Sequence, residues 1–94
     1  MLYIKVEWVH DFANEPVELY SELDDNRWEI RKVEIFRNGT GSYAWKGGAS
    51  GSSQLSITPI PALQEIRRDP QFRPAEISKE SFEDIWKKFT SREE

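Results

Sequence analysis

Hydrophobic and polar residues alternate over the first part of the chain. Between residues 2 and 9, apolar side chains occupy the even positions, and Lys5 and Glu7 lie between them. Successive side chains of a strand point to opposite faces, so this spacing predicts a half-buried strand with its even positions toward the core. A second run with the same period extends over residues 17–23, after a turn. The pattern therefore predicts two consecutive strands.

Residues 27–45, RWEIRKVEIFRNGTGSYAW, predict a β-hairpin. Apolar residues alternate on both sides of the Asn38-Gly39 pair. This dipeptide suits a two-residue turn, because both positions tolerate a positive φ. The two arms are therefore expected to pair as antiparallel strands, the second arm being short.

The apolar positions of the first hairpin arm change parity. Trp28 and Ile30 are even, whereas Val33 and Ile35 are odd. A β-bulge near residues 31–32 would account for the change, because one inserted residue exchanges the two faces of a strand. The alternative is a strand that is buried on both faces at one end.

Small and polar residues follow the hairpin. The run Gly47–Ser53 contains only glycine, alanine and serine, which predicts a flexible loop. Residues 54–58 could add a short fifth strand. Pro59 and Pro61 then predict the end of the sheet, because proline cannot donate a hydrogen bond to a ladder.

The last third of the chain predicts two helices. Residues 62–69 suit a short helix, which Pro70 would end. Ser78 is a natural N-cap for a longer helix over residues 79–90, in which Glu83 is spaced for a surface ion pair with Lys87. The apolar residues of this helix recur at helical spacing and form one stripe, made of Phe82, Ile85, Trp86 and Phe89.

These elements predict one α+β domain over residues 1–94. We expect an antiparallel sheet of four to five strands in the N-terminal two-thirds. One short and one longer C-terminal helix are expected to pack on one face of this sheet. A chain of this length buries enough apolar surface for one core and too little for two.

Composition and charge exclude several classes of function. The chain has no cysteine, which excludes disulfides, thiolate metal sites and a cysteine nucleophile. Thirteen lysines and arginines against 17 aspartates and glutamates give a formal net charge of −4, which disfavours binding to nucleic acid. The N-terminal residues do not form a signal peptide, and no apolar run is long enough to span a membrane. We therefore expect a cytoplasmic protein with neither a nucleic acid nor a membrane as its partner.

His10-Asp11 is the pair most suggestive of metal or acid–base chemistry, because imidazole and carboxylate are common ligands. His10 is the only histidine in the chain. The favoured interpretation is a loop cap, in which Asp11 accepts backbone N–H groups and His10 packs on an aromatic neighbour. Neither a metal nor a cofactor is predicted.

A cluster of acidic residues could serve binding instead of catalysis. It consists of Glu15, Glu18, Glu22, Asp24 and Asp25. Paired carboxylates can catalyse hydrolysis, but they require a walled cleft that a domain of this size hardly provides. A solvated strand face and a surface for a basic partner are the other interpretations. Exposed tyrosine and tryptophan often anchor interfaces, which makes Tyr20, Tyr43 and Trp45 candidates for contact with a partner.

Four segments, YIKVEWVHDF, EPVELYSELDDNRWE, RKVEIFRNG and EIS-K-ESFEDIWKK, resemble a small bacterial family of unknown function whose members are single domains of about this length. Genes of this family often lie next to polymorphic toxin cassettes, including those of the Rhs type. Small acidic proteins encoded there tend to be immunity proteins. The resemblance thus implies a protein that neutralises a toxin, and it carries no catalytic motif.

We therefore expect a non-enzymatic immunity protein whose partner is a cognate toxin domain with a basic cleft. The residues expected to contact the toxin are Glu18, Tyr20, Glu22, Asp24, Asp25, Tyr43 and Trp45. The alternative is a small-molecule or regulatory module, in which the Gly47–Ser53 loop closes over a ligand held by Tyr43, Trp45 and His10. A minor enzyme that uses His10 and the acidic residues is a third hypothesis.

Overall fold

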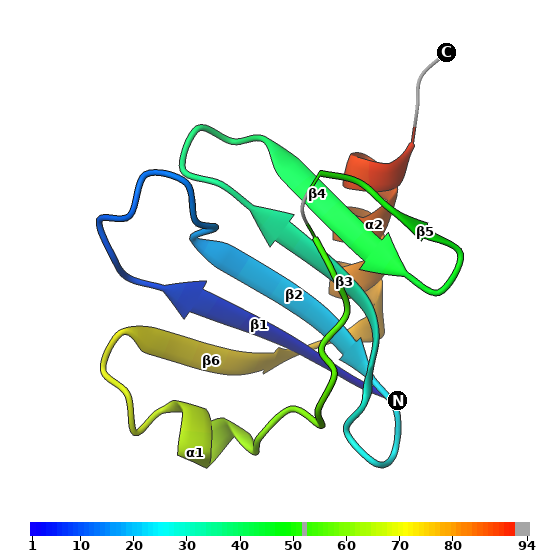
Figure 1. Ribbon diagram of the computed structural model, residues 1–94. Helices are drawn as coiled ribbons and strands as arrows, with labels where there is room; N and C mark the ends of the chain where they lie inside the picture. The colour runs from blue at the N-terminus through cyan, green and yellow to red at the C-terminus, as the bar shows by residue number, and fades with distance from the viewer. Residues whose placement is uncertain (52, 92–94) are drawn as a thin grey trace.

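A computed structural model describes residues 1–51 and 53–91. The chain forms a six-stranded antiparallel sheet with the strand order β5-β4-β3-β2-β1-β6, together with two helices (Figure 1). Along the chain, the elements are β1 (Leu2–Trp8), β2 (Glu18–Leu23), β3 (Glu29–Ile35), β4 (Gly41–Trp45), β5 (Gly48–Ala49), α1 (Leu63–Ile66), β6 (Phe72–Ile77) and α2 (Lys79–Thr90). The predicted α+β class, with a short and a longer helix after the hairpin, is confirmed.

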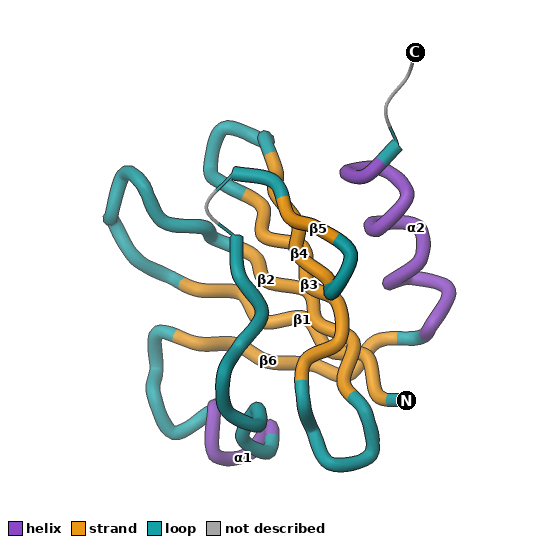
Figure 2. The backbone as a smooth tube through the Cα atoms, turned by 45° about the vertical axis from the view of Figure 1, so that its right-hand side comes forward, coloured by secondary structure: helices purple, strands orange, loops and turns teal. Residues whose placement is uncertain are grey.

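The main core lies between the sheet and α2. Tyr3, Tyr20 and Val33 point to this face and pack around Phe82 of α2, which is 0% exposed. The residues packed against this cluster are Ile35, Tyr43, Ile77, Ile85, Trp86 and Phe89. Figure 2 shows α2 along one side of the sheet and the chain that leads to α1 along the other. The two helices therefore lie against opposite faces, whereas both had been expected on one face.

Both faces of β1 carry buried residues. Ile4, on the even side that the sequence pattern assigned to the core, is 1% exposed. Tyr3, on the other side, is 7% exposed, and its ring centroid lies 5.4 Å from that of Phe82. On the face that carries Tyr3, the polar residues that the alternation predicts begin only at Lys5. The α2 core thus occupies the face that the alternation alone had assigned to solvent.

The bulge in β3 is confirmed, one position before the predicted residues 31–32. Glu22 of β2 pairs with Arg31, whereas Leu23 pairs with Glu29, so Ile30 is the inserted residue. Trp28, which the sequence pattern placed inside, is 43% exposed. It lies before β3, in a turn where Asp24 N–H donates to the Trp28 carbonyl.

The hairpin between β3 and β4 is confirmed, but its loop is longer than predicted. Phe36 N–H donates to the Thr40 carbonyl over 2.8 Å, and Gly39 N–H donates to the Phe36 carbonyl over 2.9 Å. The loop therefore contains three residues, 37–39. Only Gly39 of these has a positive φ, of 90°, as in a type I turn followed by a left-handed glycine.

The sheet does not end at the prolines. Residues 54–58 form no strand, but β6 adds to β1 after α1. Pro74 lies within β6, where it pairs in register with Val6. Proline is tolerated there because β6 is an edge strand and needs no donor on its outer side. The predicted end of the sheet was thus wrong, and α1 is shorter than the predicted residues 62–69.

The loop predicted to be flexible is anchored by serines. Ser50 N–H donates to the Tyr43 carbonyl over 2.9 Å, and Ser50 Oγ accepts Tyr43 N–H over 3.0 Å. Ser53 Oγ donates to Glu34 over 2.6 Å. These bonds hold β5 and its flanks beside β4. Ser52, a member of the predicted loop, lies outside the described residues.

Helix α2 forms as predicted. Ser78 Oγ accepts Ser81 N–H over 3.0 Å, which caps the first turn, and the apolar stripe faces the sheet. Glu83 does not behave as the predicted surface residue, because its carboxylate binds Arg31 of β3.

The central position of Phe82 makes it the residue whose truncation should destabilise the fold most. We expect Phe82→Ala to lower the free energy of unfolding by about 3–5 kcal/mol, through loss of burial and creation of a cavity. Ile57→Ala is the control, because Ile57 is 87% exposed, and it should change stability by less than about 0.5 kcal/mol. Denaturant unfolding monitored by tryptophan fluorescence checks both values. Equal effects of the two substitutions would contradict this description of the core.

Candidate binding groove

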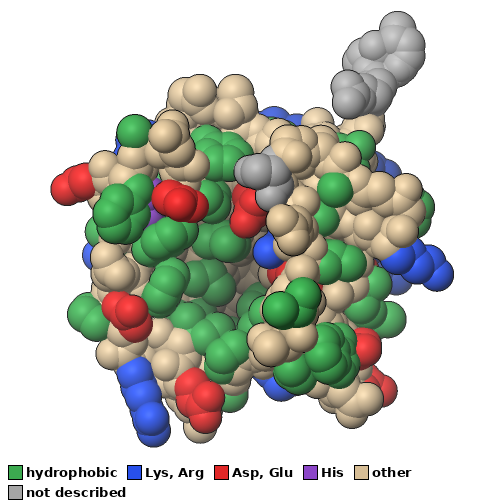
Figure 3. All heavy atoms as spheres, viewed as in Figure 1, with side chains coloured by type: hydrophobic (Ala, Val, Ile, Leu, Met, Phe, Trp, Pro, Cys, Tyr) green, Lys and Arg blue, Asp and Glu red, His purple; other side chains and the backbone are tan. Residues whose placement is uncertain are grey.

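The sheet face opposite α2 carries an open apolar groove of about 360 Å³. The groove lies between the strands β6, β1 and β2, the helix α1 and the segment 53–61. Figure 1 shows this segment crossing the sheet. We call residues 53–61 the crossing segment. The groove is lined by Ile4, Val6, Leu19, Ser21, Ile60, Pro61, Glu65, Ile66, Asp69 and Phe72. Figure 3 shows hydrophobic side chains gathered around a hollow on this face.

The floor of the groove follows from strand register. Ile4 pairs with Ser21, and Val6 pairs with Leu19, so their side chains lie next to each other on one face of β1 and β2. Phe72 of β6 borders this floor from the other side of β1. The floor is therefore built on strands that are paired on both sides, which makes it the more rigid part of the groove.

Arg27 holds one wall of the groove. Its backbone carbonyl accepts Ile60 N–H over 2.8 Å. Its side chain donates from Nε to the Ile60 carbonyl and from Nη2 to the Pro61 carbonyl, each over 2.6 Å. Arg27 has a φ of 67°, a conformation that non-glycine residues rarely adopt. The arginine thus clamps the end of the crossing segment against the β2–β3 turn.

Buried polar groups fix the start of the crossing segment. Glu29, 7% exposed, accepts bonds from Ser21 Oγ over 2.7 Å and from Ser56 N–H over 2.8 Å. Lys32 Nζ lies 3.3 Å from the Glu29 carboxylate and compensates its charge. These contacts join the segment to the polar half of the same sheet face, beside the apolar half that forms the groove.

An aromatic cluster extends the groove beyond Phe72. The ring centroid of Trp8 lies 5.8 Å from that of Phe72, 4.3 Å from that of His10 and 6.2 Å from that of Phe12. Phe12 is 56% exposed. The apolar surface of this face therefore continues from the groove across Trp8 to an exposed aromatic side chain. The indole Nε1 of Trp8 is buried and has no hydrogen-bond partner among the described residues.

His10 packs on aromatic neighbours, as predicted, but the loop is capped by His10 and not by Asp11, to which the sequence interpretation gave that role. Its Nδ1 accepts Phe12 N–H over 2.9 Å, and its Nε2 lies 2.8 Å from the Pro16 carbonyl. The carbonyl can only accept, so Nε2 carries the hydrogen and the ring is bound through both nitrogens. Within residues 1–51 and 53–91, no group of three or more potential ligand residues could hold a metal ion.

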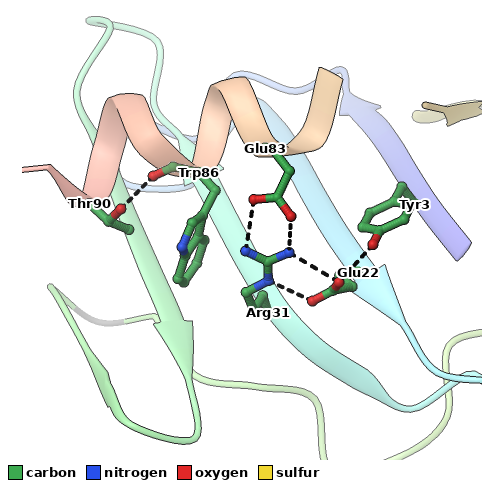
Figure 4. A network of polar contacts seen from close by, with 6 residues as sticks. All are labelled: Tyr3, Glu22, Arg31, Glu83, Trp86 and Thr90. Carbon is green, nitrogen blue, oxygen red and sulfur yellow. Dashed lines mark hydrogen bonds and ion pairs between the residues drawn. The ribbon is translucent and has the colours of Figure 1, made fainter. Parts of the chain in front are cut away.

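Glu22 and Tyr20, two predicted contact residues, are buried under α2. Glu22 accepts a bond from Tyr3 Oη over 2.9 Å and two bonds from Arg31, from Nε over 2.5 Å and from Nη2 over 3.0 Å (Figure 4). The Arg31 Nη2 also donates to Glu83 over 2.7 Å. Glu22 thus links β2, β3 and α2, and it cannot contact a toxin while the helix is docked.

This network shifts several pKa values. Burial acts to raise the pKa of Glu22, but hydrogen bonds from Arg31 and Tyr3 outweigh it, and the pKa lies below the ordinary value of 4.5. The hydrogen bond from Arg31 is the main cause of the lowered pKa of Glu83. Burial and the bond to Glu22 raise the pKa of Tyr3. The carboxylates therefore remain ionised inside the network.

The other predicted contact residues do not form one surface. Glu18 pairs with Lys5 at 3.8 Å near the start of β2. Asp24 accepts Asn26 N–H and Trp28 N–H in the turn after β2, and Asp25 is exposed in the same turn. The predicted acidic face is thus divided between the two ends of β2.

Tyr43 and Trp45 lie against α2, on the sheet face opposite the groove. Their rings meet that of Trp86 edge-on, at centroid distances of 5.5 Å and 6.4 Å. Trp45 is 43% exposed and covers Gly47, where an added Cβ would lie 2.5 Å from the indole ring. Trp45 is paired with Arg31, whereas His10 lies beyond Trp8 at the opposite end of β1, so the three residues of the ligand hypothesis do not surround one pocket.

The groove was not predicted from the sequence. Its lining comes from four separate parts of the chain. Ile66 had been assigned to a helix, and Ile60 and Phe72 to no element. Residues 72–77, FRPAEI, have no continuous period-two pattern, and Pro74 is unfavourable within a strand, so the sequence offered no signal for β6. Among the described residues, no helix is both long and apolar enough to cross a membrane.

The network around Arg31 should make stability depend on acidity. Because the pKa values of Glu22 and Glu83 are lowered on folding, their contribution is present above about pH 4.5 and is lost as the pH falls through the folded values. Glu22→Gln should lower the free energy of unfolding at pH 7 by about 1–3 kcal/mol and flatten its decline in acid. Denaturant unfolding between pH 7 and pH 3 measures both effects. The exposed Glu76→Gln is the control, and an acid limb unchanged by Glu22→Gln would contradict the assignment.

Two substitutions of Arg27 separate the effect of its side-chain hydrogen bonds from the effect of its positive φ. Arg27→Ala should cost about 1–3 kcal/mol, because two charge-assisted bonds are lost. Arg27→Gly should be more stable than Arg27→Ala by about 1 kcal/mol, because glycine tolerates the positive φ. Hydrogen exchange of the Ile60 amide should accelerate in both variants. Unchanged protection of that amide would show that the clamp does not hold the groove wall.

Comparison with known proteins places the chain in a family. The family model of a domain of unknown function, DUF6881, matches residues 2–91. No curated protein and no solved structure gives a significant match. Since the family match spans all six strands and both helices, the chain belongs to the family of the domain of unknown function DUF6881.

Proposed function

We propose that this protein is a cytoplasmic immunity protein, which binds a cognate toxin domain and occludes its active site or substrate surface. The observation that supports it best is the open apolar groove. Helix α2 seals one face of the sheet, whereas the other face exposes apolar lining residues beside the carboxylates of Glu65 and Asp69. Contiguous exposed apolar surface of this kind is typical of a binding site.

The charge of the chain supports a basic partner. Toxin domains that act on nucleic acids or nucleotides commonly present a basic cleft. An inhibitor with a net charge of −4 gains association rate and specificity from complementary charge. Such an inhibitor needs a rigid surface and no bond-making chemistry, which fits a floor made of paired strands.

We place the contact surface at the groove, because the residues assigned from the acidic pattern are buried or separated. Glu22 and Tyr20 are 7% and 8% exposed, and Asp24 is engaged in its own turn. The small-molecule alternative has less support, since Tyr43, Trp45 and His10 lie at different places on the sheet. His10 also uses both ring nitrogens within its loop, which disfavours the enzymatic hypothesis.

Co-expression with the toxin encoded by the neighbouring gene tests the proposal. We expect cells to survive only when both proteins are present, and we expect the two to elute as one complex on a sizing column. Cells that die despite co-expression, together with no complex, would refute the proposed function.

A matched pair of substitutions tests the groove. Ile66→Asp places a charge in the lining and should weaken the complex by tenfold or more, equivalent to about 1.4 kcal/mol or more. Ile57→Asp makes the same change at an exposed residue outside the lining and should have little effect. Binding is measured by calorimetry, after circular dichroism has shown that both variants are folded. Equal affinities of the two variants would exclude the groove as the interface.

A further inference from the structure

We infer that the groove takes a partner segment in which a large apolar side chain stands beside an arginine or lysine. The inference rests on the proposed function, from which it takes that the partner is a protein. It adds the chemistry of the segment that this partner places in the groove.

The dimensions of the groove favour a projecting side chain over an enclosed ligand. Its volume of about 360 Å³ is near the lower end of the range of roughly 300–1,000 Å³ for small-molecule pockets. The floor formed by Val6 and Leu19, with Phe72 at its border, is apolar, and the groove is open to solvent. An aliphatic or aromatic side chain that enters it would remove apolar surface from water without leaving a polar group unpaired.

The charged groups that line the groove are both acidic. Glu65 and Asp69 are both exposed, so a partner can reach their carboxylates. The basic side chains of the groove walls are already engaged: Arg27 binds the carbonyls of the crossing segment, and Arg67 donates to the Pro74 carbonyl over 3.3 Å. Arg68 is exposed but does not line the groove. A cation beside the apolar anchor therefore meets opposite charge, whereas an anion would be repelled.

The aromatic cluster supplies a second attraction for a cation. Trp8 and Phe72 adjoin the groove floor, and Phe12 is exposed beside Trp8. Arginine and lysine bind favourably over such rings. The apolar surface also extends past the groove, which suits a protein segment better than a molecule of the size of the groove.

Two short probes test this chemistry without the toxin. N-acetyl-leucyl-arginine amide and N-acetyl-leucyl-glutamate amide share the apolar anchor and differ in charge. Titration of the full chain, followed by methyl NMR, should move the signals of Val6, Leu19 and Ile66. The arginine probe should bind about three- to tenfold more tightly than the glutamate probe, as expected for two partly exposed charge pairs.

A double substitution tests the role of the two carboxylates. Glu65→Gln with Asp69→Asn preserves the hydrogen bond that Asp69 accepts from Gln71 N–H and removes both charges. The preference for the arginine probe should then disappear. Glu80→Gln with Asp84→Asn makes the same chemical change at exposed positions of α2, across the sheet, and should preserve the preference.

The results with the two probes distinguish a failure of this inference from a failure of the proposed function. Equal binding of both probes, no movement of the groove signals up to the solubility limit, or movement elsewhere would overturn the inference, even if the toxin binds. A clear preference for the arginine probe, with no toxin complex, would support the groove chemistry and refute only the immunity function.

Discussion

The arginine at the centre of β3 determines how the two layers of this domain meet. Arg31 binds Glu22 on the neighbouring strand and Glu83 on α2, and its guanidinium lies 4.9 Å and 5.0 Å from the ring centroids of Phe82 and Trp86. Two charge-assisted hydrogen bonds join Arg31 to Glu83, and they form only when α2 places Glu83 over Arg31, so they favour one position of the helix. Apolar packing alone would permit sliding of the helix along the sheet. The ion network therefore gives the aromatic core its alignment, and α2 remains on one face.

The opposite face is organised by hydrogen bonds between the sheet and the crossing segment. The crossing segment has no regular secondary structure, and it is held by hydrogen bonds to Arg27, Glu29 and Glu34. The groove floor, by contrast, belongs to strands with partners on both sides. A partner would thus meet a floor and a wall that are both held in place before binding, an arrangement that limits the entropy lost on binding.

Local patterns in the sequence predicted the elements whose causes are local. The alternation in β1, the hairpin and the capped helix α2 each depend on residues near to one another in the chain. Strand β6 was not predicted, because its pairing with β1 depends on residues about 70 positions apart and because Pro74 is unfavourable within a strand. The loop length at Asn38 differed because a three-residue turn uses the same Gly39 as a two-residue one.

The distance in sequence between interacting residues also explains which residues of the candidate site were interpreted correctly. Glu22 resembled a surface acid because its neutralising partner lies on another strand and is not visible in the local pattern. The aromatic packing of His10 was predicted correctly, since Trp8 and Phe12 are close to it in sequence, whereas its role as the loop cap had been assigned to Asp11. The groove combines residues from β1, β2, the crossing segment and α1, and only the folded topology brings them together.

The edges of the sheet restrict the manner in which this molecule can associate. At the β6 edge, Pro74 has no N–H and its carbonyl is occupied by Arg67, while Phe72 N–H is bonded to the Asp69 carbonyl. At the other edge, β5 and Ser50 cover β4. An incoming strand would find few free backbone groups, so recognition by strand addition and edge-to-edge aggregation are both disfavoured. Any partner must instead be selected through side chains, which allows related family members to diverge in specificity by changing a few surface residues while the backbone stays the same.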